Sequence, residues 1–216
     1  GTGCTLTMDD VEMAAVGANV SWSGVYEPGG STELNLRKCS VLGAGAYGLV
    51  SAVNLLRANI SNCPALSYSA NYGCISLTGA TAGKTYVIRD CIITQASSAG
   101  AKTGTAISVE DTDGVTIENV RVVNADFAVT GVGVTMANTS IRGLRVSNAT
   151  ATCGDAGVKL TPTNLNRCTI DDCEITGLDN SAAAIVAGLW IDPVTAGSAV
   201  SVTNCRVASI GSATCA

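Results

Sequence analysis

The sequence predicts an all-β solenoid, in which short strands coil about one axis and stack turn on turn. Three observations support this fold class. One strand-like motif recurs along the whole chain, its copies are too close together for a helix beside each strand, and Gly, Ala, Ser, Thr and Val dominate the composition. A recurring step of roughly 20 to 50 residues is the signature of a repeat architecture.

The clearest copy of the motif is residues 115–124, Val-Thr-Ile-Glu-Asn-Val-Arg-Val-Val-Asn. Apolar and polar residues alternate in it, which is typical of a strand with one buried face. An Asn or Asp follows the central apolar residue by two places, and a small apolar residue or Cys comes next. Alignment of all copies on the central apolar residue predicts one buried column: Met8, Leu36, Ile60, Ile88, Ile117, Ile141, Ile170 and Val202.

The steps along this column are 28, 24, 28, 29, 24, 29 and 32 residues. We expect each step to form one turn, which gives about seven to eight turns with two or three short strands each. Parallel crossover connections are right-handed in nearly all proteins. The sequence therefore predicts a right-handed parallel β-helix, and the unbroken repeat makes residues 1–216 a single domain.

A second strand is expected in every turn, because a small residue followed by alternating apolar residues recurs between the copies of the first motif. Polar corners such as residues 110–114 and 161–164 separate the two strands. The Ala- and Ser-rich loops 95–104 and 178–184 are expected to bulge from one side. The second strands are predicted at residues 73–77, 105–109, 133–136, 157–160 and 188–191.

Composition excludes several classes of function. The net charge is −5 and the basic residues are scattered, which argues against a nucleic-acid partner. No apolar run approaches the ~20 residues of a membrane span. The chain contains no histidine, so neither a Cys/His metal site nor a Ser-His or Cys-His nucleophile pair is available. We expect no metal and no other cofactor.

The ten cysteines fall into two groups. Five follow the Asn/Asp position directly, and each of these is either a buried free thiol or part of a disulfide between stacked turns. Within this group, Cys173 and Cys205 are expected to be buried neighbours on consecutive turns. The other five lie off this column and are the better disulfide candidates. An even cysteine count with an acidic surface favours an extracellular setting. The disulfide candidates are Cys4, Cys74, Cys153, Cys168 and Cys215.

The Asn/Asp positions form a column of their own, for which two interpretations compete. Stacked carboxylates bind Ca²⁺ in some proteins. However, the members vary in charge, and Asn and Asp also tolerate the left-handed backbone of a corner, so we favour a structural role. The column is Asp10, Lys38, Asn62, Asp90, Asn119, Gly143, Asp172 and Asn204.

Two groups of side chains are candidate sites. Asp171, Asp172 and Glu174 form the one tight acidic group on a strand, and paired carboxylates are what glycoside hydrolysis requires. Strand alternation points Asp171 outward and Asp172 into the corner, so the two are expected to diverge. On the second strand, an outward polar row is expected to end at an exposed tryptophan that offers a stacking face to a sugar or simply covers the sheet. Its candidate carbohydrate-binding residues are Thr135, Lys159 and Trp190.

Residues 157–175 contain Gly-Val-Lys-Leu, a following Asn, and Ile-Asp-Asp-Cys-Glu-Ile. This pattern resembles the parallel β-helix repeat of the pectin-lyase-like superfamily, and the resemblance covers almost the whole chain. That superfamily includes polysaccharide lyases and hydrolases, bacteriophage tailspikes and adhesin stalks. The corner Asp111-Thr-Asp113-Gly114 is similar to the Asn-Thr-Asp-Gly corner of polygalacturonase-type hydrolases, but their accompanying His and their Arg-Ile-Lys motif are missing.

The resemblance implies the fold much more firmly than the function. We expect a non-catalytic extracellular module of a fibre, filament, stalk or virion appendage; the alternative is a carbohydrate-binding or polysaccharide-degrading β-helix. Neither end shows a cap, unless Trp22, Tyr26 and the 28–30 turn fold back over the first turn. Two explanations of the uncapped ends remain open. The chain self-associates end to end, with Cys4 near Cys215 of the next copy, or it is a piece of a longer polypeptide.

Overall fold

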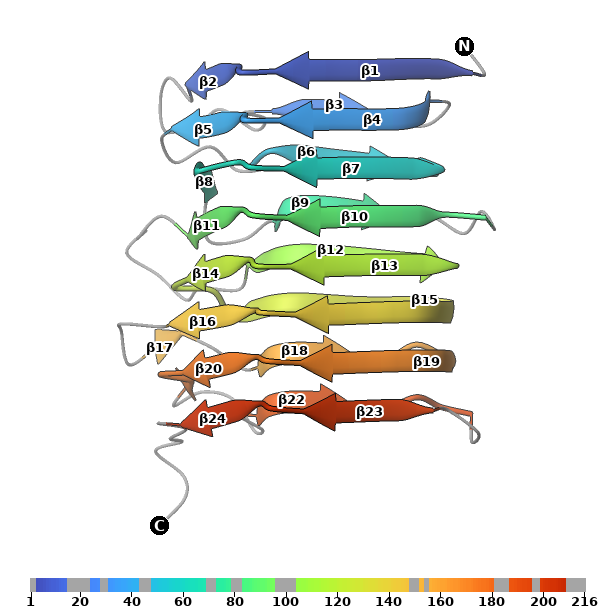
Figure 1. Ribbon diagram of the computed structural model, residues 1–216, viewed down its shortest axis with the longest axis vertical. Coiled ribbons are helices and arrows are strands. Elements are labelled where there is room, and N and C mark those ends of the chain that lie inside the picture. Colours follow the sequence, from blue (N-terminus) through green and yellow to red (C-terminus); the bar gives the residue numbers. More distant parts are fainter. Residues whose placement is uncertain are drawn as a thin grey trace.

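The computed structural model describes residues 3–14, 24–27, 31–42, 48–68, 73–78, 83–95, 104–147, 152–153, 156–180, 187–195 and 199–208. Within these residues the chain is all-β, and its strands stack as parallel rungs along one axis (Figure 1). The predicted fold class, a parallel β-helix, is confirmed. Each turn passes through three sheets in the order third, first, second.

The first sheet is the flat face nearest the viewer in Figure 1. The second is shorter and lies beyond the Asn/Asp corner, and the third lies behind the first. The first sheet contains β1 (Cys4–Asp9), β4 (Ser31–Arg37), β7 (Arg57–Ser61), β10 (Thr85–Arg89), β13 (Gly114–Glu118), the second half of β15 (Phe127–Arg142), β19 (Asn164–Asp171) and β23 (Val200–Thr203).

The second sheet has eight strands: β2 (Glu12–Ala14), β5 (Ser40–Leu42), β8 (Ala65–Tyr68), β11 (Ile92–Gln95), β14 (Arg121–Val123), β16 (Arg145–Ser147), β20 (Glu174–Thr176) and β24 (Arg206–Ala208). The third consists of β3 (Val25–Glu27), β6 (Val50–Val53), β9 (Gly73–Thr78), β12 (Thr105–Thr112), the first half of β15, β18 (Ala156–Leu160) and β22 (Ala187–Ile191). An antiparallel pair, β17 (Thr152–Cys153) and β21 (Asp179–Asn180), lies outside these sheets.

The core is built from columns of apolar side chains that run along the axis. Ile88, Ile117 and Ile170 stack in one column and are fully buried, as predicted. The strand register confirms every member of the predicted column, from Met8 through Ile117 to Val202. Aligned β-branched side chains of equal length on successive turns fill a narrow interior without voids.

The corner between the first and second sheets follows the Asn/Asp column. Every member of this column has a left-handed backbone, with φ between 50° and 64°. Asn and Asp adopt this conformation at low cost, whereas Lys38 must accept the strain. The Asn119 amide also donates to the Asp90 carboxylate at 3.3 Å. The structure therefore supports the structural interpretation of this column.

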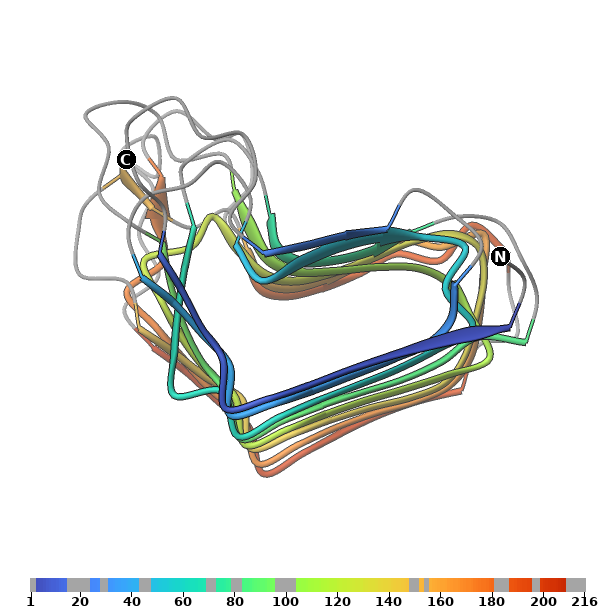
Figure 2. The same cartoon turned by 90° about the horizontal axis from the view of Figure 1, so that it is seen from above.

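Seen along its axis, the solenoid has an L-shaped section (Figure 2). The second and third sheets approach each other closely at the inside of this elbow. A Cβ atom at Gly157 would lie only 2.7 Å from the Ile175 side chain of the second sheet. The small residues at the second position of β9, β12, β15, β18 and β22, including Cys74 and Ala106, therefore fill a space that a larger side chain would not fit.

The structure contains no disulfide at the three candidates whose side chains it describes, so their pairing stays a prediction. Cys4 is an exposed free thiol, and Cys74 and Cys168 are buried free thiols. Cys168 faces inward in β19, paired with Thr139 of β15 and Val200 of β23, so it replaces an apolar core residue rather than lying near a turn. The side chain of Cys153 and the whole of Cys215 lie outside the described residues.

The five cysteines of the corner column behave as small core residues. Cys39, Cys63, Cys91 and Cys173 are buried free thiols. Cys205 adjoins Cys173 on the next turn, as predicted, but it is partly exposed because its turn is the last one described. Burial raises the pKa of Cys173 to about 11, and the neighbouring Cys205 adds to the effect.

Candidate ligand-binding surface

Charged side chains on the outer faces of the first and second sheets pair between neighbouring turns. Arg142 meets Asp171 at 3.3 Å, Arg145 meets Asp172 at 3.0 Å, and Arg206 meets Glu174 at 3.1 Å. Arg37 likewise meets Asp9. Exposed ion pairs of this kind each contribute about 0 to 1 kcal/mol, so they favour the register of the stack more than its stability.

The acidic group predicted from the sequence is divided among separate partners. Asp171 accepts hydrogen bonds from the Thr203 hydroxyl at 2.7 Å and the Asn204 amide at 3.0 Å, besides its pair with Arg142. The Thr203 and Asn204 hydrogen bonds, followed by Arg142, lower the pKa of Asp171. Because Asp172 and Glu174 each bind a different arginine, the three carboxylates do not converge on one reacting atom.

The corner at Asp111 and Asp113 is also occupied by structural contacts. The Asp111 carboxylate accepts from the backbone N–H of Val134 and, at 2.9 Å, from that of Thr135. Asp113 accepts from the backbone N–H of Gly83. Both acids therefore tie their turn to its neighbours, and this corner offers them no evident catalytic arrangement.

The outward row of the third sheet differs from the prediction at one position. The register aligns Thr130, rather than Thr135, with Ser108 and Lys159, while Thr135 pairs with Asn164 in the next corner. The row is Ser51, Ser76, Ser108, Thr130, Lys159 and Trp190.

The misplacement of Thr135 has a physical cause at Gly131. This glycine stands where the other turns carry an inward apolar residue, so the sequence pattern breaks there. A Cβ at Gly131 would lie 2.5 Å from the sulfur of Met136, because the Met136 side chain occupies the space of the missing one. The alternating pattern is therefore clear only at residues 133–136, and Thr135 was chosen in place of Thr130, which lies five residues earlier.

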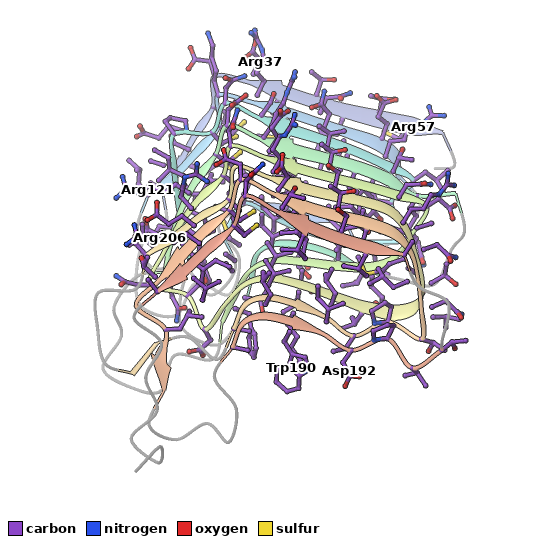
Figure 3. The ribbon with its side chains drawn as sticks, turned by 60° about the horizontal axis from the view of Figure 1, so that its bottom comes forward. Arg37, Arg57, Arg121, Trp190, Asp192 and Arg206 are labelled. Carbon is purple, nitrogen blue, oxygen red and sulfur yellow. The ribbon has the colours of Figure 1, made fainter. Side chains whose placement is uncertain are left out.

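Lys159 and two aromatic rings form a cluster on this row, which we call the aromatic–lysine cluster: Phe127, Lys159 and Trp190. The Lys159 ammonium lies 4.3 Å from the centroid of the Trp190 ring and 5.2 Å from that of Phe127. These distances suit cation–π attraction. Figure 3 shows Trp190 projecting from the third sheet, on the side of the solenoid opposite Arg37 and Arg57.

Sequence reasoning found Lys159 and Trp190 but missed Phe127. Phe127 begins β15, three places before the outward row, and the register places it beside Ala156. It is the only phenylalanine of the chain, and that rarity was the one signal that could have found it. The cluster presents a flat ring and a hydrogen-bond donor side by side, which suits the face and hydroxyls of a sugar.

A shallow hollow of about 370 Å³ lies on the outer face of the first sheet. Arg57 and Arg89 line it together with Glu33 and the amides of Asn35 and Asn59. Ligand pockets usually enclose most of their ligand, whereas this hollow is shallow and open to solvent. We assign it no ligand.

Two further searches cover only the residues that the structure describes. No group of three or more His, Cys, Asp or Glu side chains there is placed to hold a metal ion. No helix there has the length and apolarity needed to cross a membrane.

Residues 73–215 match the family model described as right handed beta helix region. The chain belongs to the right-handed β-helix family. The match covers more than half of the 216 residues and agrees with the handedness expected from parallel crossovers. No curated protein and no solved structure matches the chain. Membership of the right-handed β-helix family establishes the fold, and function has to be argued from the surfaces described above.

Proposed function

We propose that the chain is a non-catalytic structural module that assembles end to end, as part of an extracellular fibre, filament, stalk or virion appendage. One observation carries this proposal. Inward-column residues that are fully buried in the middle turns are exposed in the terminal ones: Leu6 is 39%, Val202 45% and Val207 42% exposed, against 0% for Ile117.

An exposed apolar column beside a free strand edge favours association. Unpaired N–H and C=O groups on such an edge are a template for a further strand, and natural proteins usually cover them. The ladder of ion pairs along the outer faces keeps successive turns in register, which suits a rigid rod. The extracellular setting is supported by the acidic balance of the chain, with 17 acidic against 12 basic residues.

Light scattering and negative-stain electron microscopy of the purified chain test the proposal. We expect the mean mass to rise with protein concentration and rods to form whose width matches one solenoid. A chain that stays monomeric at millimolar concentration, with its terminal strands protected from hydrogen exchange, would contradict it.

A second candidate function, carbohydrate binding, is favoured by the aromatic–lysine cluster. Stacking of a pyranose face on Trp190, with Lys159 donating to a hydroxyl or acidic group, fits the geometry of the pair. Isothermal titration calorimetry with neutral and acidic oligosaccharides tests it, because this readout does not depend on the fluorescence of Trp190. Trp190→Ala should abolish binding, whereas Ser76→Ala, in the same row, should not. Equal binding by both variants would rule out this surface.

A further inference from the structure

We propose that the partner at each end is a second copy of this chain, joined head to tail so that β23 and β24 of one copy pair with β1 and β2 of the next. This inference rests on the proposed function and specifies its joint. The two edges lie at opposite ends of the stack (Figure 1), as such a joint requires.

The backbone pattern within one copy defines the joint. At each turn, the N–H of the corner residue donates to the first sheet of the next turn: Asp10 to the Arg37 carbonyl at 3.0 Å and Asp172 to the Thr203 carbonyl at 3.2 Å. By the same pattern, the N–H of Asn204 would donate to the Asp9 carbonyl of the next copy. In the described residues, β23 is the last strand of this sheet, so Asn204 has no such acceptor in its own copy.

In the second sheet the backbone N–H groups donate to the preceding turn instead of the next one. The N–H of Ser40 donates to the Val11 carbonyl at 3.0 Å, and that of Arg206 donates to the Cys173 carbonyl at 2.8 Å. Continuing the pattern, the N–H of Glu12 would donate to the Cys205 carbonyl of the preceding copy. Because the N–H groups of successive strand residues point to opposite sides, Glu12 directs its own away from β5 and towards the joint.

The exposed apolar residues of the two ends fall in the same columns. Continuing the first sheet places Val202 next to Met8 and Val200 next to Leu6 of the next copy, in the same inward columns. In the second sheet, Val207 reaches Met13 by the same register. The joint would therefore bury the residues whose exposure supports the proposed function, and it would form a core column of the kind found inside each copy.

Charge favours the head-to-tail orientation over a joint between two β1–β2 ends. Asp9, Asp10 and Glu12 make the β1–β2 end acidic, whereas Arg206 lies exposed at the β23–β24 end. The column register places Arg206 between Glu174, which it already contacts at 3.1 Å, and Glu12 of the next copy. Joining two β1–β2 ends would instead bring like charges together.

The corner also continues across the joint without new strain. Asn204 and Asp10 both have a left-handed backbone, with φ of 52° and 58°. They would stack as Asn119 and Asp90 do within one copy. Among the described residues no strand of the third sheet comes before β1, so one strand position stays open between β22 of one copy and β3 of the next.

Two substitutions at Glu12 test the joint by sedimentation velocity of the full chain. Glu12→Lys places a cation beside Arg206 of the neighbouring copy and should weaken association by about tenfold. Glu12→Pro removes the N–H that the joint uses and should weaken it further, while each copy keeps its own ladder intact. Glu118→Lys, the same change of charge in the middle of the first sheet, is the matched control and should leave association unchanged.

A disulfide trap then tests the register. Thr7 and Ser201 occupy one outward column, so the joint places them on adjacent strands ~4.8 Å apart, within reach of a disulfide. Mixing the Thr7→Cys chain with the Ser201→Cys chain under mild oxidation should give that cross-link by peptide mapping. Thr169→Cys, one turn further inside, should not cross-link with Thr7→Cys.

The outcomes separate the joint from the function on which it rests. Rods that form equally well from the Glu12 variants, or that lack the cross-link between residues 7 and 201, would overturn this joint and leave the structural function standing. A wild-type chain that never associates would overturn both.

Discussion

At the residue scale, the buried isoleucine column shows how the middle turns are held together. Ile117 is fully buried between Ile88 and Ile141 of the neighbouring turns. A stacked column cannot collapse around a missing side chain, because the backbone ladders above and below hold their spacing.

Ile117→Ala should therefore lower the free energy of unfolding by about 2 to 5 kcal/mol. Urea unfolding followed by circular dichroism measures this loss. Thr116→Ala, which changes an outward residue of the same strand, is the control and should stay within ~0.5 kcal/mol of wild type. A loss for Ile117→Ala as small as that of the control would show that the register is wrong.

At the element scale, the corner between the first and second sheets sets how the turns are built. Left-handed backbone is inexpensive for Asn, Asp and Gly and costs other residues roughly 1 to 2 kcal/mol. Lys38 carries this cost with φ of 52°, at a position where Asn62 and Asp90 hold the same corner one and two turns later.

Lys38→Asn should accordingly stabilise the fold, by several tenths to ~1 kcal/mol, and raise the melting temperature. The reverse change, Asn62→Lys, should destabilise it by a similar amount at a matched position. The two together distinguish backbone strain from a change of net charge. In a chain of net charge −5, charge alone would make Lys38→Asn destabilising and Asn62→Lys stabilising, the reverse of what strain predicts. Calorimetric melts of both variants at one ionic strength decide the matter.

These corners also explain how much the sequence could predict. The first-sheet column was predicted at all its positions, because each turn carries an alternating strand and every corner except that of Lys38 has a residue suited to left-handed backbone. The third sheet lacks such a marker, so Gly131 was enough to shift the expected strand and to replace Thr130 by Thr135. Phe127 was missed because its approach to Lys159 depends on packing between two turns rather than on the repeat.

Cysteine chemistry was the least predictable part. A thiol in an inward column and a thiol near a corner look alike in a sequence of many short strands. Cys168 was grouped only with the cysteines off the corner column, although aligning Ile170 with Ile117 also places Cys168 at the position of Val115, two residues earlier. The register confirms this position, in the inward column of Val115 and Thr139.

At the scale of the whole molecule, a core that contains many thiols should make the free energy of unfolding fall at alkaline pH. Burial raises the pKa of Cys74 from 9.0 to about 12, and that of Cys168 to about 11. Burial also raises the pKa of Tyr86. Two groups act in the opposite direction. Burial lowers the pKa of Lys84, although Asp111, Glu110 and Asp113 partly offset this, and the hydrogen bond with Cys91 lowers the pKa of Cys63.

The sign of the dependence follows from where each form is stable. Thiols with a raised pKa in the folded chain stay protonated there but ionise in the unfolded chain, so the unfolded state gains as soon as the pH passes about 9. Below pH 9 their stabilising contribution is complete, and it falls by up to ~1.4 kcal/mol per pH unit for each such thiol until its folded pKa is reached. Lys84 and Cys63 are outnumbered by the thiols with a raised pKa, which are Cys39, Cys74, Cys91, Cys168 and Cys173.

We therefore expect the free energy of unfolding to be nearly constant between pH 7 and 8.5 and to fall steeply between pH 9 and 11. Urea melts under reducing conditions across this range measure it. Cys168→Val, which supplies the residue type found at Val115 and Val200 in the same column, should reduce the slope above pH 9 while leaving stability at pH 7 close to wild type. An unchanged slope in that variant would mean that Cys168 is not held protonated in the core, and the burial described here for β19 would be wrong.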